Sequence, residues 1–161
     1  MHPLPRSERI TREAAYLMTN YITHPSNWEF DPPFVEERTA GRKRVFLELG
    51  SGTGIVAAKI AQTAALPGRD LVIATDLPEV CTLLKRNLLI EQEGSSVGRQ
   101  LSDKVVLIRP LPWGSYDHAM KIAQEIRLIN DPSDRKDVCI THIICSDLVN
   151  DTLLAWFEIY H

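Results

Sequence analysis

The spacing of hydrophobic residues predicts that helices and strands alternate along most of the chain. Residues 8–22 place apolar side chains at i, i+4, i+7, i+8 and i+11, the pattern of an amphipathic helix that Pro25 stops. Short, almost wholly apolar runs predict four strands, at 45–49, 71–75, 104–108 and 138–145. Helical spacing follows each of the first three runs, over about 55–64, 78–88 and 116–129.

This alternation predicts an α/β fold with parallel βαβ units, and strands that are apolar throughout are expected where helices cover both faces of the sheet. Residues 24–43 hold three prolines and no hydrophobic period, which is typical of a connecting loop. We expect one domain over 1–161. Its parts are an N-terminal helix and loop (1–43), the βα units (44–149) and a divergent tail (150–161).

Composition narrows the class of protein. The chain has 161 residues, 44% hydrophobic and 24% charged, which suits one soluble domain with a sizeable core. A net charge of −3 lacks the basic excess that binding to nucleic acid needs. The sequence also predicts no membrane segment and no signal peptide, because its apolar runs are short and its first residues are charged. With only three cysteines, we expect an intracellular protein, in the cytoplasm or alternatively the nucleus.

A glycine-rich turn follows the first strand, and an acid follows the second. Gly50, Gly52 and Gly54 let the backbone turn sharply and let a ligand lie against it. Asp76 comes 22 residues after Gly54, the spacing at which an acid meets ribose hydroxyls in nucleotide-binding sheets. Since ligands bind outside the carboxyl ends of parallel strands, these residues predict a nucleoside site. The alternative is a glycine-rich loop with two solvated acids, Glu48 and Asp76.

The details of the turn favour S-adenosylmethionine over a dinucleotide. A dinucleotide fold needs a small residue at position 55, which is isoleucine here. Glu48, two residues before the first glycine, would repel a pyrophosphate but suit a cationic ligand. S-adenosylmethionine has an amine, a sulfonium and a ribose, and it has no phosphate. A dinucleotide oxidoreductase is therefore the disfavoured alternative.

The last two strands add further candidates. Trp113, between Pro112 and Gly114, offers an aromatic plane for adenine, although it could instead be a core aromatic residue. Ser146 and Asp147 follow the fourth strand and place a carboxylate near the methyl acceptor, although Asp147 could instead cap a following helix.

Two other patterns are expected to carry no chemistry. Cys139, His142 and Cys145 have the spacing of a metal motif, but on a strand His142 would point away from both cysteines, so we expect no metal site. The basic run at 42–44 is expected to be a solvated face.

Four stretches resemble, in order, the motifs of class I S-adenosylmethionine-dependent methyltransferases: VFLELGSGTGIVAAKIA, ATDLPEVCTLLKRNL, LPWGS and IICSDLV. Within that class they are most similar to the protein-lysine methyltransferases related to nicotinamide N-methyltransferase, an assignment carried by the Leu-x-Trp-Gly motif. The resemblance covers about residues 10–149. It implies a Rossmann-like sheet with helices on both faces and S-adenosylmethionine as cofactor. It also implies lysine side chains of other proteins, often elongation factors or chaperone ATPases, as substrates.

The resemblance implies roles for individual residues. The turn that contacts the methionine and ribose parts corresponds to Glu48, Gly50, Gly52 and Gly54. Asp76 corresponds to the ribose acid and Trp113 to the tryptophan beside adenine. Ser146 and Asp147 correspond to the end of the fourth strand, where Asp147 is the candidate catalytic residue.

The sequence departs from the family pattern at three places. Asn150 stands where the family has a tyrosine that frames the lysine channel, and Arg12 stands where a tryptophan is common. The family fold has seven strands, whereas this chain ends a few residues after the fourth, so the C-terminal strands are expected to be missing. These departures predict that 138–145 is an edge strand and that 1–161 alone is poorly stable and nearly inactive.

Two classes of function therefore stay open. The first is a protein-lysine methyltransferase, which needs no metal and works mainly by positioning its reactants. The second is a truncated, non-catalytic form that acts, if at all, by binding the cofactor or another protein.

Overall fold

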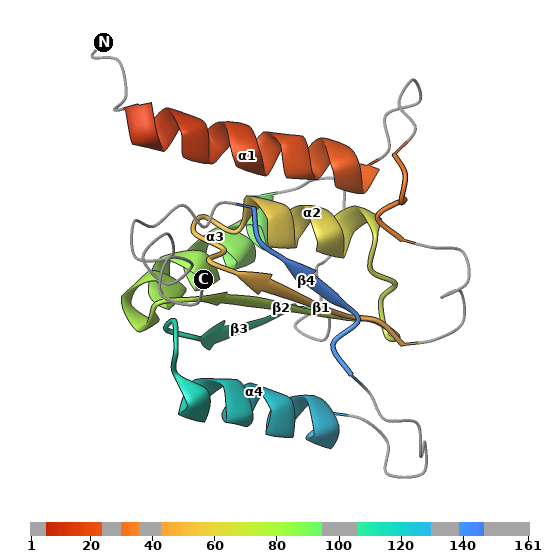
Figure 1. Ribbon diagram of the computed structural model, residues 1–161, viewed down its shortest axis with the longest axis vertical. Coiled ribbons are helices and arrows are strands. Elements are labelled where there is room, and N and C mark those ends of the chain that lie inside the picture. Colours follow the sequence, from red (N-terminus) through yellow and green to blue (C-terminus); the bar gives the residue numbers. More distant parts are fainter. Residues whose placement is uncertain (1–5, 24–29, 36–42, 95–105, 130–138, 147–161) are drawn as a thin grey trace, which may run out of the picture.

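The computed structural model describes residues 6–23, 30–35, 43–94, 106–129 and 139–146, except for the side chains of 6–12 and 89–94. Its elements are α1 (Arg6–Thr23), β1 (Val45–Leu49), α2 (Ile55–Thr63), β2 (Leu71–Asp76), α3 (Pro78–Gly94), β3 (Val106–Pro110), α4 (Tyr116–Leu128) and β4 (His142–Ile144). The four strands form one parallel sheet in the order β3-β2-β1-β4 (Figure 1). The predicted α/β, Rossmann-like architecture is confirmed.

Helices cover both faces of this sheet, as the apolar strands predict. Alternate residues of β1 supply two separate hydrophobic clusters. Phe46 belongs to the cluster that packs against α2 and α3, with Ile22 of α1 at its edge. Val45 and Leu47 belong to the cluster that packs against α4. Figure 1 shows α1 lying over α2 on one side of the sheet and α4 on the opposite side.

Three strands have other bounds than the sequence predicts, and β2 extends one residue further, to Asp76. β3 runs over Val106–Pro110 rather than 104–108, because its pairing with β2 continues past the apolar run to Pro110. β4 has three residues, His142–Ile144, so the prediction of a strand over 138–145 is too long. Its ladder with β1 begins late because the Thr141 side-chain oxygen accepts the hydrogen bond from the Val45 N–H, at 3.0 Å.

β4 lies at one edge of the sheet within the part of the chain that the structure describes, which confirms the predicted edge position. Its central residue, Ile143, is 64% exposed on the face that α4 covers elsewhere. No helix of the described residues is long and apolar enough to cross a membrane.

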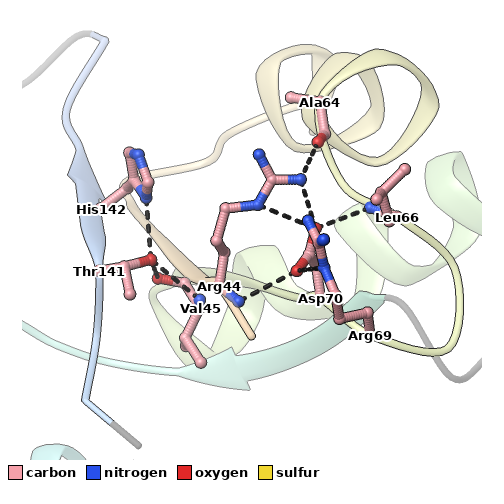
Figure 2. A network of polar contacts seen from close by, with 8 residues as sticks. All are labelled: Arg44, Val45, Ala64, Leu66, Arg69, Asp70, Thr141 and His142. Atoms are coloured by element: carbon pink, nitrogen blue, oxygen red, sulfur yellow. Dashed lines mark hydrogen bonds and ion pairs between the residues drawn. The ribbon is translucent and has the colours of Figure 1, made fainter. Parts of the chain in front are cut away.

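A buried ion pair joins the amino ends of β1 and β2 (Figure 2). Asp70 accepts hydrogen bonds from the backbone N–H and the Nε of Arg44, both at 3.0 Å, and from the Leu66 N–H at 2.8 Å. Arg69 pairs with the same carboxylate from its outer side. Burial alone would raise the pKa of Asp70, but the hydrogen bonds from Arg69 and Arg44 outweigh it and hold the pKa at about 2.

The expectation of a solvated basic run is therefore wrong at Arg44, which is 5% exposed. Its guanidinium also donates to the Ala64 carbonyl at the end of α2, so three elements meet at this one side chain. A charge can be buried here because Asp70 pairs with it.

An aromatic cluster attaches residues 30–35 to the sheet. Phe34 stacks on Phe46 of β1, and the His142 ring of β4 stacks on Phe46 at a centroid distance of 4.6 Å. Tyr21 of α1 contacts Phe34 edge to face and donates a hydrogen bond to the Pro32 carbonyl. The segment that the sequence predicts as a loop thus covers the edge of the core that faces α1.

Candidate functional site

The carboxyl ends of β1, β2 and β3 lie at one edge of the sheet, where the sequence places the ligand site. The turn from Gly50 to Gly54 leaves β1 there, and it is held against β2 by a hydrogen bond from the Ser51 N–H to the Thr75 carbonyl, at 2.9 Å. Thr75 in turn donates from its hydroxyl to the Glu48 carbonyl. The turn is therefore fixed to the neighbouring strand rather than projecting into solvent.

The three glycines of this turn do different things. Gly50, Gly52 and Gly54 all have positive φ, and a Cβ at Gly52 would meet open space. A Cβ at Gly54 would lie 2.7 Å from the Leu84 side chain of α3. Gly54 thus lets α3 approach the start of α2 closely, a packing role that the sequence-based assignment to the cofactor turn did not include. Gly52 leaves room beside the backbone, as a bound ligand would require.

Asp76 connects the end of β2 to the same turn. One carboxylate oxygen accepts the Gly52 N–H at 2.7 Å and the other accepts the Leu77 N–H at 2.7 Å. Each carboxylate oxygen can accept a further hydrogen bond. The half-buried side chain is therefore placed beside the turn with acceptor capacity left for a ligand, as the predicted role of a ribose acid requires.

A pocket of about 340 Å³ opens beside the turn on the face that α4 covers. Its walls come from the end of β1, the segment after β3 and the first residues of α4: Leu49, Gly50, Leu111, Pro112, Trp113, Gly114, Ser115, Tyr116 and Ala119. Trp113 is 54% exposed, so the alternative that it is a core residue is wrong. The pocket is mostly apolar and has an aromatic wall, which suits a flat heterocycle such as adenine.

Sequence reasoning missed part of this wall. Leu49, Leu111 and Tyr116 line the pocket, whereas the sequence had assigned Gly50 and Trp113 of its lining to the cofactor. The sequence did contain a signal for these three residues. Leu49 ends a predicted strand, Leu111 begins the LPWGS motif, and Tyr116 directly follows that motif.

Glu48 is the most deeply buried carboxyl of the site. It points to the face opposite the pocket, is 1% exposed, and neither of its carboxylate oxygens makes a hydrogen bond. Burial raises the pKa of Glu48 to about 7, and the nearby Asp76 carboxylate adds to this. The Ser51 hydroxyl and the Ala57 backbone lie near enough to lower the pKa partly, but with geometry that falls short of a hydrogen bond. The sequence predicted a charged Glu48, whereas a pKa near 7 leaves the carboxyl partly protonated at neutral pH.

The residues after β4 are described only in part. Ser146 is half-buried just beyond the strand, and Asp147 lies outside the described residues, as do Asn150 and the tail. Cys139 and Cys145 are both exposed, while His142 is stacked on Phe46. Within the described ranges, no three metal-ligating side chains come together.

Comparison with known proteins decides the family. A family model described as lysine methyltransferase matches residues 8–131 of this chain. The chain belongs to this lysine methyltransferase family. A search of curated proteins found no match.

The methyltransferase match covers most of the chain and confirms the resemblance seen in the motifs. It includes Glu48, the glycine turn, Asp76 and Trp113, and it ends before β4. The match thus identifies a methyltransferase with the fold described above. The roles of its individual residues, including Ser146 and Asp147, stay predictions.

Proposed function

We propose that this methyltransferase uses S-adenosylmethionine to methylate lysine side chains of other proteins. The observation that supports this proposal most strongly is the arrangement at the carboxyl edge of the sheet. There the glycine turn, held by Asp76, borders an apolar pocket walled by Trp113. The family to which the chain belongs is described as lysine methyltransferase, which supports the same activity.

The residues present fit this cofactor. The pocket walled by Trp113 suits the adenine, and the free acceptor capacity of Asp76 suits two ribose hydroxyls. Open space at the Cβ position of Gly52 leaves room for a ligand against the backbone. Glu48, an acid without a hydrogen-bond partner, suits the cationic part of the ligand rather than a phosphate. A dinucleotide would bring the negative charges of its pyrophosphate toward Glu48, and Ile55 stands where a dinucleotide fold needs a small residue, so a dinucleotide fits poorly.

When bound, S-adenosylmethionine supplies an electrophilic methyl group on sulfur. The role of the chain is to hold that group in line with the lone pair of a neutral lysine amine and to exclude water. Nitrogen then forms a bond to the methyl carbon, the carbon–sulfur bond breaks with its electron pair leaving on sulfur, and a nitrogen proton passes to solvent. We assign Asp147, with Ser146 beside it, to the acceptor end of this site.

The partners follow from the same proposal. The acceptor is a protein, and the resemblance suggests elongation factors or chaperone ATPases as the first proteins to test. All three cysteines of the chain are free, which supports a reducing compartment and hence a cytoplasmic location.

The test is transfer of a radiolabelled methyl group to proteins of a cell extract. It is run with residues 1–161 and, separately, with any longer form of the protein. We expect label on lysine in one or a few proteins, and loss of it in the Asp76→Ala variant but not in Glu79→Ala, an exposed acid of α3. Label found solely on nucleic acid would contradict the proposed acceptor.

A further inference from the structure

The helix that walls the pocket packs on the sheet through its second half. Of the 13 residues of α4, two are buried, Ile122 and Ile126, and both belong to the hydrophobic cluster on that face of the sheet. The first half carries exposed apolar side chains, with Tyr116 73% and Met120 36% exposed. No buried side chain of α4 therefore holds its pocket end against the strands.

A bidentate ion pair ties the second half of α4 to β3. Arg109 donates from Nε to one carboxylate oxygen of Glu125, at 2.6 Å, and from Nη2 to the other. Two parallel hydrogen bonds fix the direction of such a pair as well as its distance. The Nη1 of Arg109 donates to the Ile108 carbonyl at 2.7 Å, so the guanidinium is itself held to the strand. The ion pair thus joins the helix to a fixed point on β3.

This ion pair closes the stretch of chain that forms most of the pocket wall. Arg109 lies one residue before the end of β3, and Glu125 lies between the two buried residues of α4. Every lining residue except Leu49 and Gly50 comes from the chain between them. In Figure 1 the chain leaves β3, turns and runs back as α4. The direction of α4 against β3 therefore sets how far this wall stands from the end of β1.

Resting on the proposed function, we propose that Arg109 and Glu125 are positioning residues whose ion pair holds the α4 wall at the pocket and sets the affinity for the adenosine part of the methyl donor. Neither residue lines the pocket, so the pair acts through the wall rather than on the ligand. The two side chains are 33% and 32% exposed, so dissolved salt can screen their attraction. Affinity for the methyl donor is thereby sensitive to ionic strength.

The pair is charged at neutral pH. The hydrogen bonds between the two side chains lower the pKa of the Glu125 carboxyl and raise the pKa of the Arg109 guanidinium. Ionic strength therefore acts on this pair in a pH range where neither partner titrates.

The test is calorimetric titration of the 161-residue chain with S-adenosylmethionine and, separately, with adenosine. Adenosine is uncharged at neutral pH, so salt acts on its binding through the charges of the protein alone. We expect Glu125→Gln to bind both ligands about 2- to 5-fold more weakly, the scale of a partly exposed ion pair. Between about 0.02 M and about 0.5 M NaCl, the unaltered chain should lose affinity for adenosine by a similar factor, and Glu125→Gln should not.

Charge reversal separates positioning from a general loss of stability. Arg109→Glu sets two carboxylates side by side and should weaken binding more than Glu125→Gln does. Combining Arg109→Glu with Glu125→Arg restores opposite charges and should recover most of the lost affinity. Two exposed residues provide matched controls: Glu79→Gln on α3 and Arg127→Gln in the last turn of α4 should bind as the unaltered chain does.

The possible failures are distinguishable. If the variants unfold at lower temperature but keep the affinity and salt dependence of the unaltered chain, the pair serves stability alone and this inference is wrong. A charge-swapped chain that binds no better than Arg109→Glu would overturn it as well. If the unaltered chain binds neither ligand at any salt concentration, the proposed function fails together with this inference.

Discussion

Asp76 both fixes the glycine turn and is proposed to hold the ribose, and the two roles can be separated by substitution. Asp76→Ala removes both acceptors and should weaken binding of S-adenosylmethionine by about 1.5–3 kcal/mol, the scale of hydrogen bonds to a charged group. Asp76→Asn keeps one acceptor for the Gly52 N–H, so its effect on thermal stability should be smaller. Calorimetry and thermal unfolding measure the two effects, and unchanged affinity in Asp76→Ala would show that this acid does not meet the ligand.

Glu48 should lower the stability of the ligand-free protein at neutral and higher pH. Its pKa is about 7 in the folded chain and near the ordinary 4.5 in the unfolded chain, so the folded state binds the extra proton between these values. The free energy of unfolding therefore falls as pH rises from about 4.5 through 7, by on the order of 3 kcal/mol in all. Urea unfolding should show Glu48→Gln gaining stability relative to the unaltered chain between about pH 5 and pH 8. A difference that stays constant with pH would rule out the buried, titrating carboxyl.

At the scale of elements, the sequence predicted every helix and strand that the structure describes, because each helix has a hydrophobic period and each strand is a short, mostly apolar run. Strand bounds were less predictable, since they depend on partners distant in sequence. β4 begins late because a Thr141 side chain replaces a backbone partner of Val45. Arg44 was misjudged for the same reason, since its partner Asp70 lies on the next βα unit. For the candidate site, spacing predicted Asp76 and position after a strand predicted Trp113, but the burial of Glu48 required the fold.

The Arg44–Asp70 pair should govern the joining of β1 and β2 at their amino ends. Asp70→Asn leaves the buried Arg44 without its counter-charge and should cost about 3–5 kcal/mol at neutral pH. Because the pKa of Asp70 is lowered to about 2, its stabilising effect is present above the unfolded value of 3.8 and is lost as pH falls through about 2. Denaturant unfolding over this acid range is the measurement, and a penalty for Asp70→Asn that is equally large at about pH 2 would contradict the pairing.

Gly54 should matter for the packing of α3 on α2. In Gly54→Ala, the added methyl group would lie 2.7 Å from the Leu84 side chain on a backbone with φ 86°, so this variant should be destabilised by about 1–3 kcal/mol. Gly52→Ala meets open space and bears strain in φ alone, so it should cost less stability. Thermal unfolding of the two variants compares them, and equal losses would show that contact with α3 is not the reason for Gly54.

At the scale of the whole molecule, the sheet places the glycine turn, Asp76 and the Trp113 pocket at one edge, while the Arg44–Asp70 pair fixes the opposite ends of β1 and β2. Because the ion pair holds β1 and β2 in register from their amino ends, the candidate site at their carboxyl ends can consist of turns and loops. The family assignment and the geometry agree on a methyltransferase, and binding of the methyl donor is the property on which the rest of the account depends.

The most direct test is therefore calorimetric titration of the 161-residue chain with S-adenosylmethionine and, separately, with NAD at neutral pH. The account predicts saturable binding of S-adenosylmethionine, clearly tighter than that of NAD, because Glu48 suits a ligand with cationic groups and Ile55 breaks the dinucleotide pattern. Tighter binding of NAD, or a folded chain that binds no S-adenosylmethionine, would contradict it.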